Sequence, residues 1–333
     1  MILVIGATGY IGRYLCPYLV KKGYKVLALG RSEQGRNFLE EHSVPFQYFD
    51  LNDEDAFDKL KLSDRVDAIV DLSACLAELE TPVPRFFEVN TLGVYRVLEY
   101  ARKQEVSKVV ITSSHKVYND IPKQLISEED GISFKGDHSP YIISKVAAEL
   151  FATYYNKDFG MKSVVLRLTG VHGYGEILGK LFEDGSYKKS TFEIFFEKAL
   201  VGENIEVWGN QSIVRDHIYI KDVLSVIEAA INSGDVSGIF NIASGKGYSQ
   251  YDEACVLAEI FATNKVSKVT VDQSKPGLER GYVYDISKAQ RLLKWTPQYD
   301  DLHKMYEDYK REWISKEYHN FHKIREGEQP KTL

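Results

Sequence analysis

The first half of the chain alternates short apolar runs with longer segments in which apolar residues recur at helical spacing. The apolar runs are rich in β-branched residues and lie at Ile2–Ile5, Val26–Leu29, Ala68–Leu72, Val109–Thr112 and Val164–Leu168. The segments with helical spacing are Tyr10–Lys22, Phe86–Lys103 and Tyr141–Phe159. Strands without polar alternation are buried on both faces, and strand–helix–strand repeats pair in parallel through right-handed crossovers. The pattern therefore predicts an α/β fold built on a doubly wound parallel sheet.

The pattern changes after residue 170, and the change predicts a second part of the fold. Gly170–Ser190 is rich in glycine, tyrosine and charge, which predicts a long irregular loop, and short strands and helices then mix without clear alternation. We expect a Rossmann-type nucleotide-binding domain and a smaller C-terminal α/β lobe that closes over a substrate. The expected parts are 1–169 plus about 215–243 for the domain, 170–214 plus 244–315 for the lobe, and 316–333 for a polar tail.

Composition and charge exclude several classes of protein. The 333 residues include 42 basic and 48 acidic side chains, and the net charge of −6 gives no general attraction for nucleic acid. No apolar run approaches the roughly 18 residues of a membrane span, and the apolar start breaks at Gly6, which predicts a strand rather than a signal peptide. Cys16, Cys75 and Cys255 lie far apart and predict neither a disulfide framework nor a metal site. We expect a cytoplasmic globular protein.

A glycine pattern of the type GxxGxxG follows the first predicted strand directly. Glycines in this place let the backbone approach a pyrophosphate, which then lies at the positive end of the next helix. Because the pattern stands between a strand and a helix in a chain that continues with further βα units, it predicts a dinucleotide site. The residues of this turn that we expect to contact the dinucleotide are Gly6, Thr8, Gly9, Tyr10, Ile11 and Gly12.

The end of the second predicted strand bears on the choice between NAD and NADP. An enzyme that selects NAD places a carboxylate there to hold the ribose hydroxyls. In this chain Gly30 leaves room and Arg31 supplies a guanidinium group, which suits a 2′-phosphate. We therefore favour NADP over NAD; the alternative is that Arg31 stacks on the adenine or faces solvent.

Tyr141 and Lys145 form a YxxxK pattern, and its position in the predicted fold distinguishes it from three other pairs with the same spacing. The same spacing occurs at Tyr18/Lys22, Tyr284/Lys288 and Tyr306/Lys310. Only Tyr141 opens a helix after the strand that ends in Thr112-Ser113-Ser114, at the expected ligand edge of the sheet. Residues four apart share one helix face, so we expect the Lys145 ammonium, together with the positive nicotinamide, to lower the pKa of the Tyr141 phenol. The pair predicts a general acid or base.

Further motifs extend over nearly the whole chain in a recognisable order. They are Phe49-Asp50-Leu51, Asp71-Leu72-Ser73-Ala74, Asn90-Thr91-Leu92-Gly93, Thr112–Tyr118, Leu166–Gly173, Arg215–Val223, Phe240–Gly245 and Ser287-Lys288-Ala289. Together with the glycine turn and the YxxxK pattern, they make the chain resemble the extended short-chain dehydrogenase/reductase family. Within that family the chain is similar to NAD(P)-dependent nucleotide-sugar epimerases and dehydratases, of the UDP-sugar 4-epimerase type.

The resemblance implies roles for individual residues. It makes Ser114 the third catalytic residue and gives Lys145 a second contact with the nicotinamide ribose. Further implied cofactor contacts are Asp50, Leu51, Leu72, Ser73, Ala74 and Asn90. Arg215 and Arg280 are implied partners of the substrate's diphosphate, since forked guanidinium groups suit phosphates; for each of them a structural salt bridge is the alternative. Lys116 meets an anionic or acylated substituent of the substrate, or faces solvent.

Departures from the family pattern reduce the number of reactions that the sequence favours. Dehydratases of this family place two acids where this chain has His115 and Lys116, so the sequence argues against dehydration. Gly170 stands where galactose-type epimerases usually carry an asparagine that contacts the nucleotide. We expect an epimerase that transfers hydride at a sugar carbon, usually C4. The alternatives are an NADPH-dependent reductase of nucleotide 4-keto-deoxysugars and a dinucleotide sensor without catalysis. By the same resemblance, the two long helices 86–103 and 141–159 would form a homodimer interface.

Overall fold

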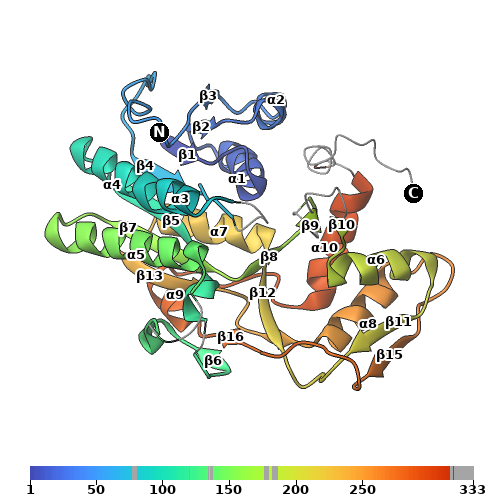
Figure 1. The fold of residues 1–333 in the computed structure, drawn as a ribbon. Coiled ribbons are helices and arrows are strands. Elements are labelled where there is room, and N and C mark those ends of the chain that lie inside the picture. The colour runs from blue at the N-terminus through green and yellow to red at the C-terminus, as the bar shows by residue number, and fades with distance from the viewer. Residues whose placement is uncertain are drawn as a thin grey trace.

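A computed structural model describes residues 1–76, 81–119, 121–133, 135, 138–175, 180, 181, 187–315 and 318. Its centre is a seven-stranded, fully parallel sheet with the strand order β13-β7-β5-β4-β1-β2-β3 (Figure 1). The strands are β1 (Ile2–Ile5), β2 (Val26–Gly30), β3 (Phe46–Tyr48), β4 (Ala68–Asp71), β5 (Lys108–Ser114), β7 (Ser163–Leu168) and β13 (Gly238–Ile242). The doubly wound parallel sheet expected from the apolar pattern is therefore confirmed.

Two hydrophobic cores cover the two faces of this sheet. On β1, Val4 points into a core shared with α1 (Tyr10–Lys21), α2 (Glu33–Glu41) and α7 (Ile220–Ile231). The neighbouring Leu3 points into the other core, which is shared with α4 (Val94–Lys103) and α5 (Pro140–Asp158). Since successive residues of a strand face opposite sides, burial on both faces explains why the strands read as continuous apolar runs.

The helix expected over Phe86–Lys103 consists of three parts. It begins as α3 (Val83–Phe86), continues as the π-helical turn η1 (Phe87–Gly93) and becomes the regular α4 only from Val94. π-Helical turns inside helices are rare and are found frequently at functional sites. Here the turn carries Asn90, which is completely buried.

The smaller lobe lies at one end of the molecule, and a continuous hydrophobic core joins it to the sheet (Figure 1). Its main elements are α6 (Thr191–Val201), β11 (Ile205–Trp208), α8 (Gln250–Ile260), β15 (Val269–Asp272) and α10 (Leu302–Ser315). The remaining, shorter elements lie in several parts of the chain. They are η2 (His115–Tyr118), β6 (Leu125–Ile126), η3 (Glu128–Asp130), β8 (Gly170–His172), β9 (Lys180–Leu181), β10 (Tyr187–Lys188), β12 (Arg215–Tyr219), β14 (Gly247–Tyr248), β16 (Val283–Tyr284) and α9 (Ser287–Leu292).

Only part of the segment from 215 to 243 belongs to the seven-stranded sheet and the helices that cover it. Helix α7 packs on the sheet and β13 forms its edge, whereas β12 belongs to a separate three-stranded sheet with β8 and β14. The predicted irregular loop after Gly170 contains β8 and the β9–β10 pair, and 176–179 and 182–186 lie outside the described residues. Of the predicted polar tail, only Tyr318 belongs to the described part of the chain.

Candidate active site at the carboxyl edge of the sheet

The turn between β1 and α1 is built for a close approach by a ligand. Gly6 has a φ of 76°, and a Cβ atom there would lie 2.9 Å from the backbone of Leu72 and Ser73. A Cβ atom on Gly12, in the first turn of α1, would lie 2.5 Å from the Cα of Ala7, so the close packing of this helix turn on the loop also requires glycine. Gly9 caps α1 without a side-chain hydrogen bond, and the first turn contains no acidic residue. This glycine cradle at a helix N-terminus fits the pyrophosphate of a dinucleotide.

The remaining predicted residues of this turn hold its shape. Thr8 fills the space beside β2 and α2, and a Cβ atom on Gly30 would lie 2.7 Å from its hydroxyl oxygen. Tyr10 and Ile11 are half-buried in the first turn of α1 and pack against the core. The absence of a side chain at position 30 therefore has a steric cause within the protein, and the preference for NADP rests on Arg31 alone.

Arg31 lies at the surface close to the other residue expected at the adenine. Its side chain is 52% exposed, and its Nη1 is 3.6 Å from Oδ2 of Asp50. Asp50 also accepts two hydrogen bonds from Asn52, through the backbone N–H and the side-chain amide. The next residue, Leu51, is buried against Gly93. Arg31 and Asp50 are thus brought together at the edge of β2, where they can meet the adenosine end of a dinucleotide.

The segment after β4 is fixed by Asn90. The Asn90 side chain accepts a hydrogen bond from the Cys75 N–H at 2.7 Å and donates to the Cys75 carbonyl and to Ser144 Oγ, both at 3.0 Å. These bonds use both of its N–H groups. Asn90 therefore holds the segment that contains Leu72, Ser73 and the exposed Ala74 against α5, and it reaches a cofactor only through that segment.

Ser114, Tyr141 and Lys145 come together as predicted by the YxxxK pattern and the family resemblance. Ser114 is the last residue of β5, and Tyr141 lies in the first turn of α5, whose start Ser139 caps by accepting a hydrogen bond from the Ile142 N–H. The Ser114 side chain lies close enough to the Tyr141 phenol to lower its pKa. Lys145 follows one turn later, is buried, and donates to the Thr112 carbonyl at 3.1 Å.

The electrostatics of Tyr141 are set by burial and by Ser114. Burial raises the pKa of Tyr141, and the nearby Ser114 side chain opposes this rise. Burial lowers the pKa of Lys145, while the nearby carboxylates of Asp71 and Glu149 raise it. Among the described residues Lys145 is not a group that lowers the pKa of Tyr141, and its ammonium group donates to the Thr112 carbonyl. The lowering expected from Lys145 together with the nicotinamide stays a prediction.

The predicted substrate residues gather around His115, directly after Ser114. Burial, and after it the charges of Lys116, Arg215 and Arg280, lower the pKa of His115 to about 3. The Nδ1 atom of His115 is 2.9 Å from the hydroxyl of Tyr284. The adjacent Lys116 and two arginines from distant parts of the sequence thus lie near one neutral imidazole, and such a cluster suits a polyanionic ligand.

The two arginines support each other's position, whereas Lys116 does not pair with a carboxylate among the described residues. Arg215 Nε donates to the Arg280 carbonyl at 3.1 Å, and Arg280 donates to the carbonyls of Tyr118 and Ile121. No described carboxylate forms an ion pair with either arginine, so the salt-bridge alternative is not observed within this part of the chain. Lys116 is exposed, and its Nζ lies 5.9 Å from the centre of the Tyr141 ring.

A buried ion pair beneath the site was not predicted from the sequence. Glu149 accepts from both ends of the Arg167 guanidinium and from Ser113 Oγ at 2.6 Å. Arg167 also donates to the Tyr118 hydroxyl at 2.5 Å. The position of Glu149, one turn after Lys145 on the same helix, was the available signal, since residues four apart share a face. The pair ties α5 to β5 and β7 where the candidate catalytic residues are attached.

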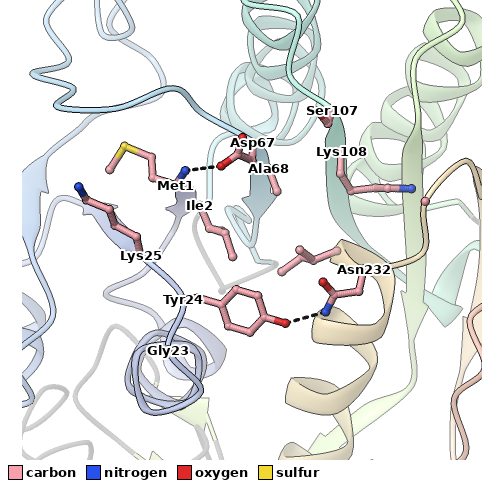
Figure 2. A pocket seen from close by; sticks show the side chains of 12 residues that line it. Met1, Ile2, Gly23, Tyr24, Lys25, Asp67, Ala68, Ser107, Lys108 and Asn232 are labelled. Atoms are coloured by element: carbon pink, nitrogen blue, oxygen red, sulfur yellow. Dashed lines mark hydrogen bonds and ion pairs between the residues drawn. The ribbon is translucent and has the colours of Figure 1, made fainter.

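A polar recess lies at the opposite, amino edge of the sheet (Figure 2). Its volume is about 440 Å³, and Met1, Asp67, Tyr24 and Asn232 are among the residues that line it. Burial lowers the pKa of the nearby Lys108 to about 8. Ligands of open α/β sheets bind at the carboxyl edge, so this recess is separate from the candidate site.

Neither a metal site nor a membrane-spanning helix is found in the part of the chain that the structure describes. There, no three His, Cys, Asp or Glu side chains are grouped so that they could hold a metal ion. None of the helices in those residues is both long enough and apolar enough to cross a membrane.

Known proteins resemble the chain over most of its length. The model of the NAD dependent epimerase/dehydratase family matches residues 2–243. A UDP-glucose 4-epimerase of Halalkalibacterium halodurans is 25% identical over 92% of this chain and 93% of its own length. A dTDP-4-dehydro-6-deoxy-D-allose reductase of a Streptomyces species is 26% identical over 89% of this chain and 91% of its own. The solved structure of an epimerase from Methanothermobacter thermautotrophicus is 26% identical, covers 97% of this chain and 94% of its own, and has a TM-score of 0.76.

Proposed function

Since the chain belongs to the NAD dependent epimerase/dehydratase family, we propose that it epimerises a nucleotide-diphosphate sugar at C4, with Tyr141 as the acid and base. The observation that carries the proposal is the placement of Ser114, at the end of β5, beside Tyr141 at the start of α5, with the buried Lys145 one turn further along. The UDP-glucose 4-epimerase relative supports a UDP-sugar as the substrate.

Each of the three residues has a distinct task in this reaction. Tyr141 takes the proton of the sugar's C4 hydroxyl and later returns it, and Ser114 donates a hydrogen bond that stabilises the phenolate. Lys145 places a buried positive charge beside these groups and holds the ribose of the cofactor. When bound, the nicotinamide supplies a hydride acceptor and donor. On the substrate side, Arg215 and Arg280 hold the diphosphate and Lys116 lies beside the sugar.

The glycine turn and the residues around it form the proposed cofactor site. The backbone at Gly6, Gly9 and Gly12 holds the pyrophosphate, and Arg31 with Asp50 meets the adenosine end. Arg31 supports NADP over NAD, because its exposed guanidinium forms only a long contact with Asp50. Equilibrium titration with the two dinucleotides tests this choice, and tighter binding of NAD by the wild-type protein would overturn it.

The test of the function uses the purified protein with UDP-glucose or UDP-galactose and no added cofactor. We expect conversion between the two sugars, monitored by nuclear magnetic resonance, because an epimerase recycles a cofactor that it retains. Tyr141→Phe should lower the rate by about 10²–10⁴-fold, the usual contribution of general acid–base catalysis, while UDP binding stays unchanged. Tyr251→Phe, at an exposed tyrosine of α8, is the matched control. Full activity of Tyr141→Phe would contradict the proposal.

A reductase of nucleotide 4-keto-sugars is the second candidate, and Arg31 is the observation that favours it. A reductase consumes NADPH in proportion to product, whereas an epimerase shows no net consumption. One of the relatives is a reductase of this kind, so a relative's name supports this second candidate as well. Loss of NADPH absorbance in step with reduction of a 4-keto substrate, without epimerisation, would assign this function. A sensor without catalysis is disfavoured by the complete set of Ser114, Tyr141 and Lys145.

Two further properties belong to this proposal. The protein acts as a homodimer through α4 and α5, which carry exposed apolar side chains. It acts in the cytoplasm, in keeping with the three free cysteines at 16, 75 and 255, since oxidising compartments favour paired cysteines.

A further inference from the structure

Lys145 lies in a buried polar layer between the sheet and α5. The residue is 3% exposed, and its Nζ donates a hydrogen bond to the Thr112 carbonyl. An ammonium group has three N–H bonds, so this contact leaves two of them for other partners. A buried charge is costly unless an opposite charge lies close to it. The position of Lys145 therefore calls for a carboxylate in the same layer.

Glu149 lies one turn after Lys145 on α5, but its carboxylate is already engaged. It accepts hydrogen bonds from the Arg167 guanidinium, at 3.0 Å to Oε1 and 2.6 Å to Oε2, and both side chains are buried. Ser113 Oγ donates to the same carboxylate at 2.6 Å. Since Arg167 carries one positive charge, the pair is neutral as a unit. Glu149 therefore does not balance the charge of Lys145.

Asp71, the last residue of β4, is another carboxylate of this layer. Ile69 of the same strand belongs to the core shared with α4 and α5, and alternation along the strand directs Asp71 to the same side. Burial raises the pKa of Asp71 and lowers that of Lys145, and each of the two charges opposes the effect of burial on the other. Thr112 links them, because its carbonyl accepts from Lys145 and its hydroxyl donates to the Asp71 carbonyl at 3.1 Å.

The two oxygens of the Asp71 carboxylate are used differently. Oδ1 accepts a hydrogen bond from the Ser73 N–H at 2.9 Å and so closes a turn at the start of the segment that Asn90 holds. Oδ2 is buried and has no hydrogen-bond partner among the described residues. Buried polar atoms without partners are few in native proteins, and each calls for an explanation. The turn alone does not explain the charge of Asp71, because an asparagine closes such a turn as well.

We propose that Asp71 supplies the counter-charge of Lys145 and thereby positions this ammonium group for the proton transfer at Tyr141. The proposal rests on the proposed function, because it takes Lys145 as the cation of the catalytic set. Asp71 acts through Lys145 and is therefore a positioning residue. Its carboxylate keeps the ammonium group charged at a pH at which burial alone would release the proton.

A substitution of Asp71 by asparagine isolates this charge. Other titratable groups face the same region from the elements packed around Lys145; they are Tyr141 and Glu149 of α5, Arg167 of β7 and Lys116 of η2. Asp71→Asn leaves all of them in place and removes one negative charge. It also keeps the oxygen that accepts from the Ser73 N–H, so the turn stays closed.

The first measurement follows the protonation of Lys145 directly and needs no activity. The protein is labelled with carbon-13 lysine, the Lys145 signal is identified by its absence from Lys145→Arg, and nuclear magnetic resonance follows it as the pH rises. Asp71→Asn should lower the midpoint by about one pH unit or more, the usual effect of a nearby opposite charge. Asp222→Asn, at a buried carboxylate of α7 that accepts from backbone N–H groups, is the matched control and should leave the midpoint unchanged.

The second measurement is the pH dependence of kcat/KM for the interconversion of UDP-glucose and UDP-galactose. The reaction needs the Lys145 ammonium group, so kcat/KM falls as the pH rises through the pKa of Lys145. Asp71→Asn lowers this pKa, and the fall should move to lower pH by about one unit. A residue that only closes a turn would not move it. Asp71→Thr is a second neutral variant, suited to a strand end, and it replaces Asp71→Asn if circular dichroism shows that the latter does not fold.

The outcomes separate this proposal from the function on which it rests. An unchanged Lys145 midpoint in the neutral variants overturns the proposal. A lower midpoint with an unchanged kcat/KM profile overturns the positioning role, because the charge of Asp71 then has no effect on the reaction. If the wild type does not interconvert the two UDP-sugars, the proposed function fails and the positioning role fails with it, while the titration still decides whether Asp71 balances the charge of Lys145.

Discussion

Among the described residues, Ser114 is the group that lowers the pKa of Tyr141, against the effect of burial. A tyrosine that acts as a base must lose its proton, so the rate rises with pH as the phenol ionises. Any change that raises the pKa of the phenol moves this rise to higher pH. The pH profile of the reaction therefore reports on the contact between the two side chains.

Ser114→Ala should shift the rise of kcat/KM to higher pH and lower its value at pH 7 by about 10- to 100-fold, the usual effect of losing a hydrogen bond to a charged group. Ser114→Thr keeps the hydroxyl and should retain the wild-type profile. The measurement is kcat/KM between pH 6 and 10. An unshifted profile in the alanine variant would show that Ser114 does not act on Tyr141.

The last helix, α10, is attached to the nucleotide-binding domain by buried charges. Lys221 of α7 pairs with Asp308 at 2.6 Å and with Glu312 at 2.9 Å. Burial raises the pKa of both carboxyls; the hydrogen bonds from Lys221 and Arg311 bring that of Asp308 below its usual value, whereas that of Glu312 stays raised. Glu312 also accepts a hydrogen bond from Tyr14 of α1. The helix thus reaches the element that follows the glycine turn.

Lys221→Met should destabilise the protein by about 2 kcal/mol at pH 7, because it leaves two buried carboxylates without their shared cation. The folded-state pKa of Glu312, already above its usual value, then rises further, and that of Asp308 rises from its lowered value. Carboxyl groups with a raised pKa favour the folded state at low pH and lose this contribution as the pH rises through the folded pKa. The loss relative to wild type should therefore be smaller at pH 5 than at pH 7 in urea unfolding. Lys246→Met, which breaks the exposed pair with Asp300, should cost under about 1 kcal/mol at both. A loss independent of pH would contradict this account.

At the scale of elements, the sequence predicts the regular parts and misses the irregular ones. The strand over 2–5 and the helices starting near 10 and 140 follow from burial and from helical spacing, which are local properties. The π-helical turn η1 was not predicted, because it depends on Asn90 bonding to Cys75 and Ser144 across space. Likewise the segment from 215 was expected within the nucleotide-binding domain, yet β12 pairs with β8 and β14, a choice made by tertiary packing.

At the scale of the molecule, the sequence locates the candidate site but does not identify all of the residues that line it. The glycine turn and the pair Tyr141 and Lys145 are local motifs, so the sequence alone finds them. Arg215 and Arg280 were brought in only by the family resemblance, since their meeting depends on the path of the chain between them. His217 lies within the motif Arg215–Val223, but the sequence analysis assigned no function to it. Its buried Nδ1 has no hydrogen-bond partner among the described residues, a property of the folded chain, which no spacing in the sequence reveals.

The outer surface of α4 and α5 carries apolar side chains that solvent would otherwise contact. Leu150 and Tyr154 lie one turn apart on α5 and are 64% and 48% exposed, and the neighbouring helix adds Leu92 and Tyr95. The two helices pack against each other and form one continuous surface (Figure 1). In a two-fold dimer such a surface meets its own copy, so four helices would cover these side chains together.

This surface predicts a homodimer that a charged substitution disrupts. Leu150→Glu combined with Tyr154→Glu places four carboxylates at the two-fold interface, where like charges repel and lose their hydration. We expect the wild type to have the mass of a dimer and the double variant that of a monomer, measured by size-exclusion chromatography with light scattering. Ile314→Glu, at a 62% exposed residue of α10, should remain dimeric. A wild-type monomer, or a double variant that stays dimeric, would show that α4 and α5 are not the interface. Because α5 also carries Tyr141 and Lys145, the interface supports the helix on which the proposed catalysis depends.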